Sequence, residues 1–184
     1  FGLKQLVLFD SAETPMHNIR LELEEKFPDV EFTPVMGDIR MIHRVGSIYQ
    51  RFHPQLVFHA AAYKHVPLME ENPCEAVHTN VYGTRNVADM AVKYDVDKFI
   101  MVSTDKAVNP TNVMGASKRL AEMYVQSLSI AISKGRHSGK TRFITTRFGN
   151  VLGSNGSVIP RFREQLAKGG PLTVTPVSYT HLTL

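Results

Sequence analysis

Residues 98–104 read KFIMVST, and after a loop residues 113–133 read VMGASKRLAEMYVQSLSIAIS. The first run has the length and the β-branched and aromatic content of a strand, and the second has the length and pattern of a helix. The same order, a short strand-like run followed by a longer helical pattern, recurs on both sides of this pair. Such alternation predicts an α/β fold: a parallel sheet, doubly wound and Rossmann-like, covered by helices.

The remaining elements follow from the same patterns. Strands are predicted at 4–10, 31–37, 55–61, 98–104 and 141–148, with a weaker one near 171–175, and helices at 16–27, 41–52, 72–94, 113–133 and 158–168. We expect residues 1–150 to form an NAD-binding Rossmann domain, 151–176 to begin a small nucleotide-sugar-binding region, and 177–184 to be a non-native tail.

Composition narrows the classes of function. The chain has 184 residues, of which 43% are hydrophobic and 21% charged, as in an ordinary globular domain. Its net charge of +4 suits a small anionic ligand, but the basic residues form no run, which argues against nucleic acid. A lone Cys74 predicts neither a disulfide framework nor a metal site. No apolar stretch reaches the roughly 18 residues of a membrane span, so we expect no transmembrane segment in the chain and a cytoplasmic location.

Three strand ends carry residues that suit a dinucleotide. The first strand ends in Asp10, placed as in Rossmann domains that bind the adenosine ribose hydroxyls. The second closes with Gly37, Asp38 and Ile39, and the third with Ala60-Ala61-Ala62, where small residues would let a dinucleotide approach the backbone. Each feature alone also fits a helix cap or a tight turn. Together they favour NAD as cofactor, with NADP as the other choice.

The strand 98–104 is followed by a concentration of reactive groups. Ser103, Thr104, Asp105 and Lys106 lie at its end, and Lys118 follows on the next helix. Lys118 lies four residues after Met114, so both residues project from one face of that helix. Met114, taken alone, also fits a core methionine.

Three separated motifs carry a family resemblance. Residues 59–70 (HAAAYKHVPLME), 103–118 and 147–154 (RFGNVLGS), the last followed by SVIP at 157–160, resemble the polysaccharide-biosynthesis nucleotide-sugar 4,6-dehydratases of the extended short-chain dehydrogenase superfamily. The resemblance covers about residues 4–175. Met114 stands where most short-chain dehydrogenases have tyrosine, which is similar to the often membrane-anchored branch that retains configuration at C5.

The sequence departs from the family at two places: it has no glycine-rich motif, and from about Val177 onward it leaves the family pattern, where we expect the non-native tail. No Gly-x-Gly-x-x-Gly occurs, so we expect the Rossmann fold to lack its first strand and glycine-rich loop. That strand is the central one, and we therefore expect the gap between the strand ending at Asp10 and the strand 55–61 to be open or spanned by a non-native pairing. Alone, the chain is expected to be insoluble or loosely folded and to bind NAD no better than millimolar order.

The resemblance implies catalytic roles. Lys106 would remove the C5 proton of the sugar, and Asp105, with a raised pKa, would protonate the departing C6 hydroxyl. Lys118 would hold the nicotinamide ribose and stabilise a C4 alkoxide, while Ser103 or Thr104 would donate a hydrogen bond to the C4 oxygen. Without a tyrosine phenol, the C4 base stays open between Asp105 and a water.

Substrate contacts are also implied. Lys64 and His65 would bind the substrate, and Asn80 would orient the active-site backbone. The other implied substrate-binding residues are Asn150, Ser154, Ser157, Val158 and Ile159. Solvated, capping or helix-surface roles are the alternatives for Lys64, Asn150 and Asn80. His65 and His59 fit pocket or core positions better than zinc sites, and no metal is expected.

The expected activity is NAD-dependent dehydration of a UDP-N-acetylhexosamine, UDP-N-acetylglucosamine in particular, to a 4-keto-6-deoxy sugar. A nucleotide-sugar 4-epimerase and a non-catalytic nucleotide-sugar or NAD-binding module are the alternatives. The Asp105-Lys106 pair favours the dehydratase, because an epimerase has no use for an elimination pair. A homo-oligomeric parent is expected, with membrane contact only through an anchor outside this chain.

Overall fold

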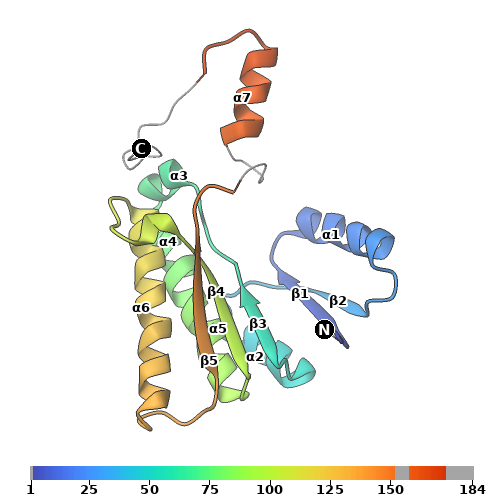
Figure 1. Ribbon diagram of the computed structural model, residues 1–184, viewed down its shortest axis with the longest axis vertical. Coiled ribbons are helices and arrows are strands. Elements are labelled where there is room, and N and C mark those ends of the chain that lie inside the picture. The colour runs from blue at the N-terminus through green and yellow to red at the C-terminus, as the bar shows by residue number, and fades with distance from the viewer. Residues whose placement is uncertain (1, 152–157, 173–184) are drawn as a thin grey trace.

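The computed structural model describes residues 2–151 and 158–172 of an α/β protein (Figure 1). In chain order the elements are β1 (Leu6–Asp10), α1 (Glu13–Lys26), β2 (Phe32–Met36), α2 (Ile42–Phe52), β3 (Leu56–His59), α3 (Val66–Glu71), α4 (Pro73–Ala76), the π-helical segment η1 (Val77–Gly83), α5 (Thr84–Lys93), β4 (Lys98–Thr104), the 3-10 turn η2 (Asp105–Ala107), α6 (Val113–Ser133), β5 (Arg142–Phe148) and α7 (Val158–Ala167).

The strands form two parallel sheets, one of β1 and β2 and one of β3, β4 and β5 in that order. Figure 1 shows the β1–α1–β2 unit standing beside the three-stranded sheet. Within the described residues no ladder joins β1 to β3. Phe58 of β3 is 69% exposed. The open gap expected from the sequence is therefore present.

The main core lies between the three-stranded sheet and the helices packed on it. Alternate residues of β4 point into it, and Phe99 and Met101 are fully buried. Val125 of α6 and Ala88 of α5 close the same core from the helix side. Because the strands are parallel, the carboxyl ends of β3, β4 and β5 meet at one end of the sheet, toward α3 (Figure 1).

Two elements match their predicted bounds: the strand 98–104 and the helix 113–133. The predicted helix 72–94 is divided by the π-helical turn at 77–83. The helix at Val66–Glu71 was not predicted. It buries one residue, Met69, and also contains a proline and two acidic residues, so its sequence shows no clear helical pattern. The weak strand near 171–175 is absent at 171–172, and its other residues lie outside the described part of the chain.

Candidate active site at the carboxyl ends of the strands

The turn after β4 joins three of the predicted catalytic side chains. Thr104 Oγ1 donates to Asp105 Oδ1 at 2.9 Å, and Lys106 Nζ lies 3.2 Å from the same oxygen. Lys106 Nζ also donates to Asn150 Oδ1 at 3.3 Å, just beyond β5. The 3-10 turn creates this geometry, because Lys106 N donates back to Thr104 Oγ1. A carboxylate, an ammonium group and an amide are thus brought together at one sheet end.

The expected raised pKa of Asp105 is not present in this arrangement. Partial burial acts to raise the pKa, but the hydrogen bonds from Thr104 and Lys106 and the charge of the Lys106 ammonium group outweigh it. The pKa of Asp105 therefore lies below its ordinary value, and the carboxylate is ionised at neutral pH. Its side chain is 56% exposed, so a bound molecule can reach it.

Lys118, on α6, contacts β4 close to its carboxyl end. Its residue is 7% exposed, and Nζ donates to the carbonyl oxygen of Val102 at 3.2 Å. Burial lowers the pKa of Lys118 to about 8, against an opposing effect of the Glu122 carboxylate. Burial and the charge of Lys118 lower the pKa of His59, on β3, to about 3, and the imidazole shares a 2.8 Å hydrogen bond with Thr84 Oγ1.

The two candidate hydroxyls lie on opposite faces of β4. Ser103 is 5% exposed, and its Oγ has no hydrogen-bond partner among the described residues. Thr104 is half-buried and already bonded to Asp105. Thr104 thus stands with the Asp105-Lys106 pair, whereas Ser103 faces α6.

Met114 is a packing residue in the structure. It is 3% exposed and forms a small cluster with Met69 of α3 and Ala76 of α4. A thioether in an apolar cluster has no proton to exchange, so its inclusion among the catalytic residues is corrected. The core-methionine alternative describes it better.

The beginning of α6 is held closely against the catalytic turn. Asn112 Oδ1 caps the helix by accepting from Gly115 N at 2.8 Å. A Cβ on Gly115 would lie 2.4 Å from the carbonyl oxygen of Lys106, so only glycine fits. Glu70 Oε1 accepts from Val113 N at 2.6 Å and ties α3 to this helix end. This role of Glu70 was not predicted, because its partner lies 43 residues away in the sequence.

Asn80 has a positioning role within η1. It is fully buried, and its side chain accepts from Tyr63 N at 2.8 Å and donates to Tyr63 O at 3.1 Å and to Ser117 Oγ at 2.9 Å. These contacts hold the backbone that follows β3 against α6, as the sequence analysis expected. They leave Asn80 no surface for direct substrate contact, which corrects its grouping with the substrate-binding residues.

The predicted cofactor residues are spread over both sheets. Asp10 is exposed at the end of β1, and its Oδ1 caps the following turn by accepting from Ala12 N. Asp38 is ion-paired with Arg40 at 2.7 Å, and hydrogen bonds from Arg40 lower its pKa despite partial burial. Ile39 is a core residue, 8% exposed, and packs on Gly83. The buried side chain leaves only the backbone of Ile39 for a cofactor contact, so that assignment stays a prediction.

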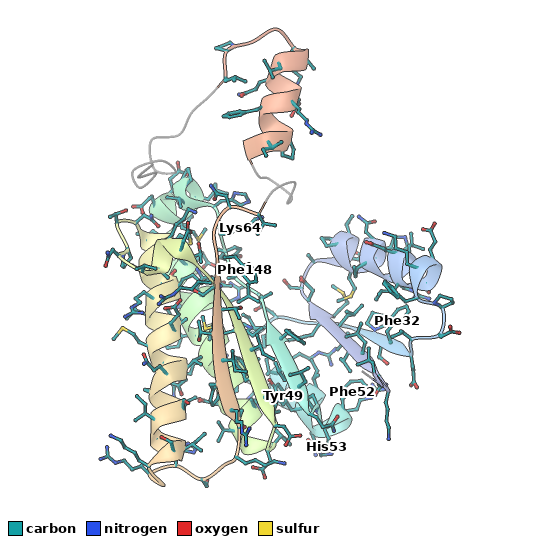
Figure 2. All side chains as sticks on the ribbon, viewed as in Figure 1. Phe32, Tyr49, Phe52, His53, Lys64 and Phe148 are labelled. Carbon is teal, nitrogen blue, oxygen red and sulfur yellow. The ribbon has the colours of Figure 1, made fainter. Side chains whose placement is uncertain are left out.

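Ala60, Ala61 and Ala62 lie just past β3, exposed or half-buried, and Lys64 and His65 follow them as exposed residues. Figure 2 shows Lys64 at the same end of the sheet as Phe148, the last residue of β5. Ile159 is half-buried in α7. Ser154 and Ser157 lie outside the described residues, as does the side chain of Val158.

A cavity of about 550 Å³ lies between α6 and β5. Arg119, Glu122 and Gln126 line it from the helix, and Thr145 and Arg147 from the strand. Within the described residues no cluster of His, Cys, Asp and Glu is placed to hold a metal ion. None of the helices in the described part of the chain is both long and apolar enough to cross a membrane.

The sequence matches the family described as "Polysaccharide biosynthesis protein" over residues 1–183. The chain belongs to this family. It is 49% identical over 176 residues to the capsular polysaccharide biosynthesis protein CapD of Staphylococcus aureus. This match covers 95% of the chain and 28% of CapD. It is 42% identical over 183 residues to a UDP-glucose 4-epimerase of Rickettsia rickettsii. This match covers 99% of the chain and 50% of the epimerase. The chain thus spans half or less of the length of these relatives.

Solved structures show the same Rossmann-like fold. Pen from Bacillus thuringiensis is 38% identical, with a TM-score of 0.84, over 94% of this chain and 52% of that one. DesIV, a dTDP-glucose 4,6-dehydratase from Streptomyces venezuelae solved with NAD and DAU bound, is 20% identical, with a TM-score of 0.72, over 94% of this chain and 55% of that one. At that identity DesIV supports the fold alone.

Proposed function

We propose that this chain is the catalytic part of an NAD-dependent nucleotide-sugar 4,6-dehydratase acting on a UDP-N-acetylhexosamine, UDP-N-acetylglucosamine in particular. The observation that carries the proposal is the Asp105-Lys106 pair at the end of β4, with Lys106 Nζ held between Asp105 Oδ1 and Asn150 Oδ1. Elimination of water needs one group that removes a proton and one that donates a proton, and this pair supplies both types within one turn. The membership in a polysaccharide biosynthesis family supports a sugar substrate.

The residues present suit a dinucleotide in several respects. Asp10 offers an exposed carboxylate at the end of β1, as a ribose-binding residue would. The alanines after β3 are small and leave room at the end of that strand, and the buried amine of Lys118 lies near the end of β4. NAD, when bound, would accept a hydride from C4 of the sugar and later return it to C6.

The residues of the chain would carry the proton steps. Thr104 would donate a hydrogen bond to the C4 oxygen, and Lys118 would stabilise its negative charge. Lys106, after releasing its ammonium proton to solvent, would take the C5 proton made acidic by the C4 ketone. Asp105 would give a proton to the C6 oxygen as the C6–O bond breaks and water leaves. The C5 proton returned at the end completes a 4-keto-6-deoxy sugar, with loss of one water and no net redox.

The lowered pKa of Asp105 limits when it can act. In the structure its carboxylate is ionised, because Thr104 and Lys106 both donate to it. Ionised Asp105 is suited to accept the C4 hydroxyl proton first, and that same proton would then be available for the C6 oxygen. This sequence also supplies the C4 base that the methionine at 114 cannot provide.

A 4-epimerase is the second candidate, because the Rickettsia relative carries that name. Mass spectrometry of UDP-N-acetylglucosamine incubated with the full-length protein and NAD separates the candidates. Loss of one water supports the dehydratase, an isobaric product with changed C4 configuration supports the epimerase, and an unchanged substrate that still binds supports a non-catalytic module.

We place the activity in the cytoplasm.

A further inference from the structure

Glu122 lies on α6 one turn beyond Lys118, and its side chain is 5% exposed. Arg147 of β5 binds it with two hydrogen bonds, Nε to Oε1 at 2.9 Å and Nη2 to Oε2 at 2.6 Å. Arg119 Nη1 adds a third at 3.2 Å to Oε2. A carboxylate this deeply buried persists as an anion only when it is paired in this way, and the pairing lowers the pKa of Glu122 although burial acts to raise it.

The position of this carboxylate relates it to the proposed site. Ser103 and Arg147 are direct neighbours in the β4–β5 ladder, and the helical spacing places Glu122 on the same face of α6 as Lys118. The Ser103 hydroxyl is close enough to the Glu122 carboxylate to contribute to its lowered pKa, although the two groups do not form a well-aligned hydrogen bond. Glu122 thus lies directly under the strand end that carries Thr104, Asp105 and Lys106.

Few charges act on Lys118. His59 faces it from β3 and is neutral, and β4 contributes the uncharged Val102 carbonyl. On α6 itself Glu122 is the charged group that opposes the effect of burial on the Lys118 pKa. Within the described residues, Glu122 is therefore the group that favours the protonated form of this buried amine.

We propose that Glu122, anchored by Arg147, is a positioning residue that keeps the Lys118 amine protonated while the Val102 carbonyl holds it at the end of β4. The proposal deepens the proposed function, because a charged Lys118 is what would stabilise negative charge on the C4 oxygen. Its electrostatic part is independent of the reaction. An ion pair that served only to join α6 to β5 would affect stability and leave the titration of Lys118 unchanged.

The test is the titration of Lys118 in the full-length protein. NMR of ¹³C-labelled lysines follows its ε-carbon against pH, with the signal assigned by its loss in Lys118→Met. In Glu122→Gln we expect Lys118 to titrate at lower pH than in the wild type. Each unit of that shift lowers the charged fraction about tenfold at pH values above both pKa values. Glu122→Asp, which keeps the charge, should recover much of the shift.

Arg119→Gln is the matched control, because it removes a partner of the same carboxylate without removing the carboxylate. We expect its Lys118 titration to stay or move to higher pH, the opposite direction to Glu122→Gln. An unchanged Lys118 titration in a folded Glu122→Gln protein would overturn the proposal.

Two further measurements keep the test decisive. If Glu122→Gln does not fold, the double variant Glu122→Gln/Arg147→Met removes both charges of the buried pair, a change that proteins often tolerate. A smaller downward shift is expected, because loss of the Arg147 cation opposes the effect of losing the carboxylate, and a Lys118 titration as high as in the wild type would overturn the proposal. If the wild type leaves UDP-N-acetylglucosamine unchanged, the proposed function fails, while the titration still decides the role of Glu122.

Discussion

Lys106 Nζ donates to Asn150 Oδ1 at 3.3 Å, across 44 residues of sequence. The contact joins the turn after β4 to the residue that follows β5, and it orients the amine between an amide and the Asp105 carboxylate. This relationship gives Lys106 a defined direction, which a base that removes one particular proton requires.

Lys106→Ala should reduce loss of water from the sugar by roughly 10²- to 10⁴-fold, since it removes the proposed C5 base. NAD affinity should stay nearly intact, because the amine is assigned to the sugar. Product formation by mass spectrometry and NAD titration measure the two effects. Lys140→Ala is the control: Lys140 pairs with Asp97 at the opposite end of β4. Wild-type turnover in Lys106→Ala would remove Lys106 from the mechanism.

Asp105→Asn should cost a comparable factor, because an amide neither accepts the C4 proton nor donates one to the leaving hydroxyl. Single-turnover absorbance of reduced nicotinamide shows which step is lost. If Asp105 serves both steps, no reduced cofactor accumulates; if a water is the C4 base, reduced cofactor builds up and persists. Asp97→Asn is the matched carboxylate control and should turn over normally. Full activity in Asp105→Asn would refute either role.

Met114→Ala should destabilise the fold by about 2–5 kcal/mol, the usual cost of truncating a buried methionine. Met114→Leu, which nearly conserves volume, should cost less than about 1.5 kcal/mol. Turnover per folded molecule should change little in either variant, because the Met114 side chain packs in an apolar cluster. Chemical denaturation and kcat measure these quantities. A collapse of kcat in a stably folded Met114→Leu protein would show a catalytic role that packing does not explain.

Gly115→Ala should impair both stability and turnover, although alanine usually stabilises a helix by roughly 0.5–1 kcal/mol relative to glycine. The added Cβ would lie 2.4 Å from Lys106 O and would displace the catalytic turn. Gly46→Ala is the contrast, since its Cβ would meet only Met90 Sδ at 3.4 Å. We expect that variant to be neutral or slightly stabilised in thermal unfolding. Equal behaviour of the two variants would contradict the close contact at Gly115.

His59 should make the fold sensitive to acid. Its folded pKa of about 3 lies below the unfolded value of 6.5, so between these values the unfolded chain binds a proton that the folded chain does not. Stability is therefore lost as pH falls below about 6.5, by about 1.4 kcal/mol per pH unit from this group. Urea unfolding at pH 7 and pH 5 measures the effect. His59→Gln should show a shallower loss over that range; an identical slope would exclude His59 as its source.

The periodicity of the chain determined the architecture. The predicted strand 98–104 and helix 113–133 match the structure, because one is a β-branched and aromatic run and the other has the length and pattern of a helix. The motif order also indicated the Asp105-Lys106 pair, since residues adjacent in sequence at a strand end stay adjacent in space. The open gap between β1 and β3 followed from the absence of a glycine-rich motif.

Tertiary contacts decided the roles of the other residues. Glu70 and Glu122 act through partners that are 43 and 25 residues away, and no local pattern announces such contacts. Ile39 and Met114 are packing residues because neighbouring elements bury them, whereas the same letters in a motif suggested a site. The ionised state of Asp105 likewise follows from two donors placed by the fold. Sequence specifies which groups reach the sheet end, and packing decides which are buried, paired or charged there.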